Sequence, residues 1–460
     1  MGKKFYVKVL CLCLTMSMLT GLNGCAMLLQ NMRQQSRNEA QSGDSDTNGT
    51  MEGSGEQASN QEQSGGNTAN QDANAEPAPD YNDSVVEDVL QDKKFQNKLE
   101  LIGELVDQCY LNGVSAEAVQ EGMFRGLLAG LGDPYSCYYT AEEYAALMES
   151  TNGIYCGIGA LVQQNINTML ITIVKPFVDG PAYKAGMLPG DIVYMVDEID
   201  VTGMNIDNVV AMMKGEANTI VKVTVLRGSE QIELVITRDF VEVETITHEM
   251  LENQIGLITI SEFDEVTIQQ FKDAIDRLQA EGAKGYIIDL RGNPGGLVNV
   301  TVDMLDYLLP KGLLVYTEDK YGQKEEYSAT DDHEVDLPIV VLINENSASA
   351  SEIFAAAMQD YEAATIVGTT SFGKGIVQSI YPVSWLASTL GVKGFAEDGS
   401  AVKVTISTYY TPNGRCIHGT GITPDVEVEL EEELKQQVVI EQKDDNQLQK
   451  AIEILQEKIK

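Results

Sequence analysis

The fold class of the C-terminal half of the chain is indicated by the stretch Ile339-Val340-Val341-Leu342-Ile343-Asn344-Glu345-Asn346-Ser347-Ala348-Ser349-Ala350-Ser351-Glu352. Its first five residues are apolar and predict a buried strand, because a strand covered on both faces carries few polar side chains. Ser349 and Glu352 then match the capping box that begins a helix. Ser349 therefore lies in the turn between a buried strand and a helix, where the active groups of α/β sheets belong.

Strands and helices alternate on both sides of this stretch, from about Thr245 to Val428. Apolar runs between amphipathic segments indicate a sheet that helices cover on both faces, and hence an α/β unit. The segments that we expect are a strand at Gly256–Ile260, a helix at Ile268–Ala280, a strand at Gly285–Leu290, a helix at Val298–Leu309 and a strand at Leu313–Tyr316.

Ser349 and Lys374 are the most informative pair of residues. Lys374 lies in Gly373-Lys374-Gly375-Ile376-Val377-Gln378, and the chain has only three histidines. A serine hydroxyl needs a base to become a nucleophile, and a lysine can be that base. The lysine pKa, about 10.4 in water, must then fall by about 3 units through burial without a carboxylate partner. The motif contains no acid, and the Gln378 amide can accept from the amine without holding its proton. The chain looks like a serine/lysine hydrolase.

A glycine-rich loop, Asn293-Pro294-Gly295-Gly296, follows another of the expected strands. Helix N-termini and tight glycine loops expose backbone N–H groups, which stabilise the oxyanion of an acyl-transfer reaction. We expect one donor from Ala350 and the other from Gly295 or Gly296. The alternative, in which Ser349 only caps a helix, explains neither the lysine motif nor this loop. The loop lacks the P-loop and GxGxxG patterns, so nucleotide binding is not indicated.

A second unit, from about Asn152 to Arg238, alternates strands with one helix at Ile206–Met213. Its loops Gly157-Ile158-Gly159-Ala160 and Gly180–Ile192 together resemble those of a PDZ domain. Such a domain adds an extended peptide to a sheet edge and holds its carboxylate on backbone N–H groups, here those of the first loop. A glycine-rich hairpin in an ordinary β domain is the alternative. The expected strands are Ala160–Val162, Leu170–Val174, Ile192–Val196, Val221–Leu226 and Ile232–Thr237.

The N-terminus carries three lysines before an apolar stretch from Val9 to Leu19, as a secretory signal does. Leu22-Asn23-Gly24-Cys25 resembles the lipobox of bacterial lipoproteins, in which Cys25 would be lipidated and hold the exported protein at the outer face of the cell membrane. An ordinary signal peptide and an uncleaved anchor are the alternatives. Residues 26–80 are rich in Gln, Asn, Ser, Gly and Ala, which predicts a disordered tether.

Composition argues against several other classes of protein. The chain has 31 Lys and Arg against 70 Asp and Glu, a formal charge of −39, so we expect no nucleic-acid partner. It has no HExxH motif and no paired Cys/His spacing, so we expect no metal and no cofactor. The globular part contains Cys109, Cys137, Cys156 and Cys416, and isolated cysteines are more often buried apolar residues than disulfide partners.

Periodic apolar residues between positions 85 and 149 predict a helical region. The loop Gly130-Leu131-Gly132-Asp133-Pro134-Tyr135-Ser136 interrupts it, and Thr140–Glu143 has the form of a capping box that begins the next helix. We expect the interrupting loop to contribute to packing alone.

The C-terminal segment after Glu429 is strongly charged and carries an apolar stripe at Leu448, Ile452 and Leu455. A stripe at this spacing predicts a helix that is either solvated or in contact with a second copy of the chain. We favour the homodimer contact, because no other surface for the stripe is evident.

Four motifs match one family in the same order. They are Asp289-Leu290-Arg291-Gly292-Asn293-Pro294-Gly295-Gly296, the segment Asn344–Glu352, the segment Gly373–Gln378 and Tyr409-Tyr410-Thr411-Pro412-Asn413-Gly414. From about Asp88 to Glu429 the chain resembles a bacterial carboxyl-terminal processing protease, also called a tail-specific protease.

This resemblance implies that Ser349 is the nucleophile, Lys374 the general base and Gln378 the residue that orients the lysine amine. It also implies that the PDZ-like unit captures the apolar C-terminal tails of protein or peptide substrates and can move to open or block the catalytic tunnel. No cofactor is required for this chemistry.

The expected fold class is multidomain α+β, with an N-terminal helical segment, a PDZ-like β domain and an α/β core of the crotonase/Clp-protease type. The expected domains are a lipoprotein signal peptide at 1–25, a disordered tether at 26–80, an N-terminal helical region at 81–150, a PDZ domain at 151–240, a serine/lysine protease core at 241–430 and a charged helical segment at 431–460.

Two other functions stay open. A tethered PDZ module on a latent or inactive core would bind C-terminal peptides without cutting them, although intact Ser349, Lys374 and Gln378 argue against it. An esterase with the same pair of groups is disfavoured by the peptide-binding domain. Formation of product from a peptide distinguishes these functions.

Overall fold

The computed structural model describes residues 85–330, 335–394, 398–435 and 440–459. Its contacts divide these residues into a unit that ends at Gly122 and a unit that begins at Met123. The predicted signal, the lipobox at Cys25 and the tether lie outside the described residues. None of the helices within the described ranges combines the length and apolarity that a membrane crossing requires.

The first unit is helical, as its apolar periodicity predicts. Asp92 begins the longest of its helices, because its carboxylate accepts a hydrogen bond from the Lys94 N–H at 3.0 Å. The helices are α2 (Val85–Gln91), α3 (Lys93–Cys109) and the first part of α4 (Ala116–Ala129).

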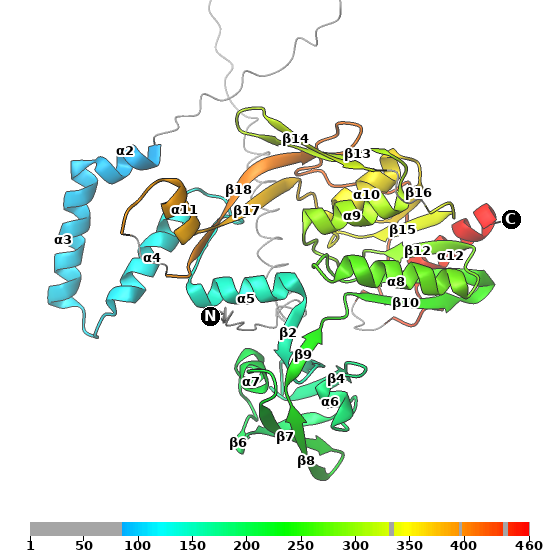
Figure 1. Ribbon diagram of the computed structural model, residues 1–460, viewed down its shortest axis with the longest axis horizontal. Coiled ribbons are helices and arrows are strands. Elements are labelled where there is room, and N and C mark those ends of the chain that lie inside the picture. Colours follow the sequence, from blue (N-terminus) through cyan, green and yellow to red (C-terminus); the bar gives the residue numbers. More distant parts are fainter. Residues whose placement is uncertain (1–84, 331–334, 395–397, 436–439, 460) are drawn as a thin grey trace, which may run out of the picture. The chain divides into compact units, whose positions relative to one another are not determined.

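A six-stranded sheet forms the centre of the second unit (Figure 1). Five strands are parallel, and β10 is antiparallel to its neighbour at one edge. The strands, in spatial order, are β10 (Ile246–Leu251), β11 (Ile255–Ile260), β12 (Gly285–Asp289), β15 (Ile339–Ile343), β16 (Ala364–Gly368) and β19 (Val426–Glu427).

Alternate side chains of the central strands enter two separate cores. In β12, Tyr286 and Ile288 pack with three helices in the larger core, whereas Ile287 belongs to a smaller core on the other side. This alternation is the consequence of the two-residue period of a strand, and it explains why these strands are apolar throughout. The helices of the larger core are α8 (Thr267–Ala280), α9 (Val298–Leu308) and α10 (Ala350–Asp360).

The C-terminal helix α12 (Asn446–Ile459) covers the other face of the sheet. Leu448 and Leu455 are fully buried there, among apolar residues of β11, β12, β15 and β16. The prediction that this stripe makes a homodimer contact is therefore wrong. A parallel sheet needs cover on both faces, and the sequence between the strands supplies helices for only one of them.

A second, antiparallel sheet contains strands from distant parts of the sequence. Its longest strand, β18 (Ala401–Tyr410), pairs with β1 (Cys137–Tyr139), β13 (Gly312–Asp319) and β17 (Ile376–Pro382), and β14 (Lys324–Ala329) pairs with β13. The strand expected at Leu313–Tyr316 forms as part of β13, but it belongs to this sheet and not to the parallel one. An apolar run predicts a strand without identifying the strand's neighbours.

Residues between the two-stranded pair β2 (Ile154–Gly157) and β9 (Asp239–Glu242) form a separate β domain with its own core. The predicted helix appears as α7 (Ile206–Met213), and each predicted strand forms with small shifts at its ends. Its strands are β3 (Ala160–Gln164), β4 (Ile171–Pro176), β5 (Ile192–Val196), β6 (Ile199–Asp200), β7 (Ile220–Arg227) and β8 (Glu230–Thr237), with β3 at one edge of the sheet.

Helix α5 (Ala141–Asn152) leads into this β domain. The predicted capping box forms, because Thr140 Oγ1 accepts from the Glu143 N–H at 3.2 Å and Glu143 accepts from the Thr140 N–H at 3.0 Å.

The cysteines are less buried than their sequence context suggests. Cys156 is buried, whereas Cys109 and Cys416 are exposed and Cys137 is partly exposed. The four are free thiols, so the expectation of small buried residues is correct for Cys156 alone.

Candidate active site

Ser349 lies between β15 and α10, as the strand and capping patterns predict. Its backbone has φ 55° and ψ −114°, a conformation that a residue with a side chain rarely adopts. Neighbouring serines hold the loop in place, because Ser347 Oγ donates to the Leu290 carbonyl at 2.7 Å and Ser351 Oγ donates to the Asn293 carbonyl at 3.0 Å. This strain, maintained by buried hydrogen bonds, is typical of a functional position.

The glycine loop packs directly against Ser349. A Cβ atom on Gly295 would lie 2.8 Å from the Ser349 Cβ and 2.9 Å from the Ala350 nitrogen, so only glycine fits. The Gly295 N–H donates to Asn293 Oδ1 at 2.8 Å. Within the described ranges, the N–H groups of Gly296 and Ala350 donate to no protein acceptor. Of the two glycines predicted as an oxyanion donor, Gly296 is thus the one whose N–H is available.

Glu352 joins the Ser349 loop to the Lys374 loop. Its carboxylate is fully buried and accepts four hydrogen bonds, two from the backbone N–H groups of Ser349 (2.9 Å) and Lys374 (2.8 Å). The other two come from Ser371 Oγ (2.5 Å) and the Gly373 N–H (2.6 Å). Burial raises the pKa of Glu352, and the four hydrogen bonds oppose that rise. Three of the four partners are backbone N–H groups, which can only donate, and they suit the carboxylate form.

The Lys374 side chain lies in a partly buried position beside the ring of Tyr135. Its Nζ atom is 4.7 Å from the centre of that ring. Burial, followed by the like charge of Lys403, lowers the pKa of Lys374 to about 8, and the carboxylates of Glu352 and Asp133 oppose the decrease. The lowered pKa agrees with the sequence prediction, but the two acids near the amine lie outside the lysine motif.

Gln378 lies in β17, beside β18. Its Nε2 atom donates to Thr405 Oγ1 at 3.2 Å, and among the described residues it makes no hydrogen bond to Lys374. Thr405 Oγ1 in turn donates to Asp133 Oδ2 at 2.6 Å.

Sequence reasoning missed several residues of this site. Glu352 was predicted only as a helix cap, and the loop that contains Asp133 and Tyr135 only as a packing element. Thr405 gave no signal at all, because a threonine is ordinary in a β-strand. The capping pattern of Glu352 and the interruption of a helix at Asp133 were the available signals.

In the β domain, the loop between β2 and β3 has the form that a terminal carboxylate needs. The carbonyl oxygens of Ile158 and Gly159 accept from Ala182 (2.6 Å) and Phe177 (3.0 Å), whereas the N–H groups of Ile158 and Gly159 make no backbone hydrogen bond in the described part of the chain. Gly159 has φ 71°, and a Cβ atom there would lie 3.2 Å from Val241. Glycine is needed at this position for both reasons.

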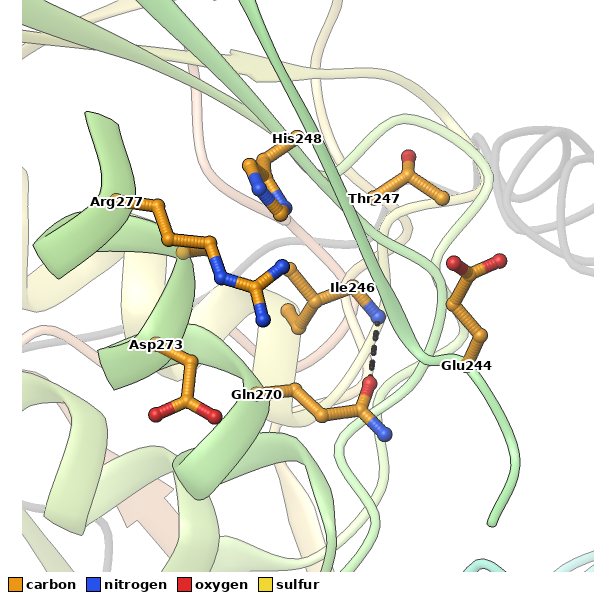
Figure 2. A pocket seen from close by; sticks show the side chains of 8 residues that line it. Glu244, Ile246, Thr247, His248, Gln270, Asp273 and Arg277 are labelled. Carbon is orange, nitrogen blue, oxygen red and sulfur yellow. Dashed lines mark hydrogen bonds between the residues drawn. The ribbon is translucent and has the colours of Figure 1, made fainter. Parts of the chain in front are cut away.

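A polar cavity lies apart from these residues. It has a volume of about 270 Å³ and is lined by residues of β10 and α8 and of the segment before β10 (Figure 2). Gln270 Oε1 accepts there from the Ile246 N–H at 3.1 Å. Neither this cavity nor any other part of the described ranges gathers three His, Cys, Asp or Glu side chains as a metal site.

The chain matches three family models. They are peptidase family S41 over residues 254–428, the PDZ domain over residues 174–227 and the N-terminal domain of the activating protease CtpB over residues 34–143. The first two models fall on the α/β unit that holds Ser349 and on the separate β domain.

Curated relatives match over most of the chain. The carboxy-terminal processing protease CtpA of Bacillus subtilis is 39% identical over 341 residues, which are 74% of this chain and 70% of that protein. A probable CtpA-like serine protease of Staphylococcus epidermidis is 37% identical over 334 residues, which are 72% of this chain and 65% of that protein.

Among solved structures, the photosystem II D1 C-terminal processing protease is similar, with 28% identity and a TM-score of 0.42 over 75% of this chain and 88% of that one. The extent of the match to the Bacillus relative and the S41 model on the Ser349 unit together show that the chain belongs to peptidase family S41, as a carboxyl-terminal processing serine peptidase with a PDZ domain.

Proposed function

We propose that this chain is an endopeptidase in which Ser349 attacks the peptide carbonyl and Lys374 is the general base. The observation that carries the proposal is the carboxylate of Glu352, which binds the backbone of both residues and brings the two loops together. The Lys374 amine, with a pKa of about 8, is partly neutral near neutral pH and can take the hydroxyl proton.

The reaction then follows from the surroundings of Ser349. The serine oxygen forms a bond to the carbonyl carbon, and the N–H groups of Ala350 and Gly296 donate to the resulting oxyanion. Protonated Lys374 gives its proton to the leaving amine as the peptide bond breaks. Water then attacks the acyl group with Lys374 again as base, which releases the second product and restores Ser349.

Substrates would be selected by their C-terminal tails. The N–H groups of Ile158 and Gly159 are suited to a terminal carboxylate, and β3 is an edge strand to which an extended peptide can add. Binding without cleavage, by a latent or inactive core, is the competing function. Lipid attachment at Cys25 would hold the enzyme at the outer face of the cell membrane, in keeping with the resemblance of its surroundings to a lipobox.

Cleavage by variants of the two reacting residues tests the proposal. We expect the chain from Asp80 onward to cut an unstructured protein with an apolar C-terminus, and Ser349→Ala and Lys374→Ala to lower the rate at least about 10³-fold, because no acyl group can be transferred without nucleophile or base. The measurement is product formation by mass spectrometry. Tail binding by all three proteins with no cleavage by any of them would support the binding-only function instead.

The pH dependence tests the role of Lys374. Neutral amine is the active form, so kcat/KM is expected to rise with pH through about 8 and then to level off. Lys403→Gln removes the like charge beside the amine, so it should raise the pKa of Lys374 and move this transition to higher pH. Peptide binding to Ser349→Ala across the same range is the control. A rate that is constant from pH 6 to pH 9 contradicts the role of Lys374 as base.

Tail recognition is tested with a peptide whose C-terminus is either free or amidated. Hydrogen bonds to a charged group contribute about 1.5–3 kcal/mol, so amidation should weaken binding to the Ser349→Ala protein at least about tenfold. Calorimetry measures both affinities, and a peptide with a charged last residue tests the apolar preference. Equal affinity for the free and the amidated peptide would rule out binding of the terminal carboxylate by the PDZ domain.

The anchor is tested by fractionating cells that express the full chain. Cys25→Ala should move the protein from the membrane fraction to the soluble or secreted fraction, because it removes the site of lipidation. Cys109→Ala, at an exposed cysteine of the globular part, is the matched control. Unchanged membrane association of Cys25→Ala would show that another feature holds the protein there.

A further inference from the structure

The loop at Asp133–Ser136, expected from the sequence only to pack, makes a hydrogen-bonded network with β18. The carboxylate of Asp133 accepts from Ser136 Oγ at 2.5 Å and from Thr405 Oγ1 at 2.6 Å. It also accepts from the Tyr135 N–H at 3.0 Å, and Ser136 Oγ accepts from the Thr405 N–H at 3.0 Å. The pairing of β1 with β18 places the loop beside Thr405.

The protons in this network can be assigned along the chain of hydrogen bonds. Burial raises the pKa of Asp133, but the hydrogen bonds from Ser136, Thr405 and Tyr135, together with the positive charge of Lys374, outweigh burial and leave the pKa below its ordinary value. Ionised Asp133 can only accept, so the single hydroxyl proton of Thr405 points toward it. The Thr405 oxygen is then an acceptor for its other neighbour.

This assignment fixes the orientation of the Gln378 amide. The Nε2 atom of Gln378, 3.2 Å from Thr405 Oγ1, must be the end that faces the threonine, because only the NH₂ group can donate. The carbonyl oxygen of Gln378 is therefore left to accept a hydrogen bond elsewhere. An acceptor is the end of the amide that an amine or ammonium group requires.

The same loop touches Lys374 directly. Tyr135 presents the face of its ring to the amine, with Nζ 4.7 Å from the ring centre. Such contact restricts the positions of the amine and favours its protonated form, which arises when it takes a proton from serine. The charged groups that act on Lys374 are Asp133 from this loop, Glu352 from α10 and Lys403 from β18.

We propose that the Asp133–Ser136 loop is a positioning element for the catalytic pair: Asp133 acts through the Thr405 hydroxyl to present the Gln378 carbonyl oxygen to Lys374, and the Tyr135 ring limits where the amine can lie. The inference rests on the proposed roles of Ser349 and Lys374. It assigns a role in the reaction to a segment that precedes the PDZ domain and lies outside the part of the chain matched by the peptidase model.

Thr405→Val tests the central link, because it removes one hydroxyl and keeps the size of the side chain. We expect kcat to fall about 10- to 100-fold with little change in KM, since the Gln378 amide is no longer oriented while tail binding is untouched. Thr405→Ser keeps the hydroxyl and should retain a kcat within about threefold of the wild type. Thr408→Val is the matched control, because Thr408 lies on the same strand with similar partial burial, and its hydroxyl makes no hydrogen bond among the described residues.

A double-mutant cycle distinguishes positioning through Gln378 from a general effect on the fold. If Thr405 acts through Gln378, the variant with both Gln378→Ala and Thr405→Val should be no slower than Gln378→Ala alone. If the reductions in kcat of the two single variants multiply in the double variant, the proposal is overturned. A wild-type kcat in Thr405→Val overturns it as well. A loss that appears in KM and in the unfolding temperature, with kcat unchanged, would show a structural role and overturn it as well.

The pH profile separates the two contributions of Asp133. Asp133→Asn removes a negative charge near Lys374. The pKa of Lys374 should therefore fall, and the acidic limb of the kcat/KM profile should move to lower pH. Thr405→Val leaves the charge of Asp133 in place, so the acidic limb of its kcat/KM profile should lie at the same pH as in the wild type. A shifted limb in Thr405→Val, with an unshifted limb in Asp133→Asn, would contradict the proposed roles of both residues. Ser349→Ala distinguishes failure of the proposed reaction from failure of the positioning role. If Ser349→Ala still cleaves the substrate, Ser349 is not the nucleophile. If Ser349→Ala is inactive and Thr405→Val is fully active, only the positioning role is refuted.

Discussion

The candidate active site depends on one buried carboxylate, that of Glu352. Glu352 stands in the first turn of α10 and binds the backbone of the Ser349 turn on one side and of the Lys374 loop on the other. An apolar residue in its place would leave four donors without an acceptor, at a cost of about 1–3 kcal/mol for each buried one, which are Ser371 Oγ and the Gly373 N–H. The relative position of the proposed nucleophile and base is thus determined by hydrogen bonds to main-chain atoms, which have far less freedom than the two side chains.

This arrangement places a carboxylate close to Lys374, which must lose its proton if it is the base that we propose. An unshielded carboxylate would hold the ammonium form and raise its pKa. In Glu352 the charge is compensated by four donors, and burial together with Lys403 has the larger effect on the amine, whose pKa is about 8. A carboxylate can therefore connect the two loops while the pKa of Lys374 stays low, as its proposed role as base requires.

The sequence predicted local structure well where periodicity and turn chemistry agree. The helix α7, the capping box at Thr140 and the turn at Ser349 all follow from residues within a few positions of one another. It failed where the deciding contact is distant in sequence. The apolar stripe on α12 was predicted to contact a second copy of the chain, because nothing near Leu455 in the sequence indicates that one face of the sheet lacks other helices. The environment of Lys374 was described without acids, because Glu352 and Asp133 lie in other motifs.

The pairing of β1 with β18 has a consequence for the time at which activity arises. Asp133 and Thr405 bond to one another across 272 residues of sequence, and the Lys374 loop lies between them along the chain. During synthesis, Thr405 leaves the ribosome 272 residues after Asp133, so the segment before the PDZ domain cannot form these contacts when it is made. Contacts of such long range form late and slowly in folding. A nascent chain that stops before β18 already contains Ser349 and Lys374 but cannot form the pairing of β1 with β18, so the surroundings of Lys374 are completed only after both residues have been made.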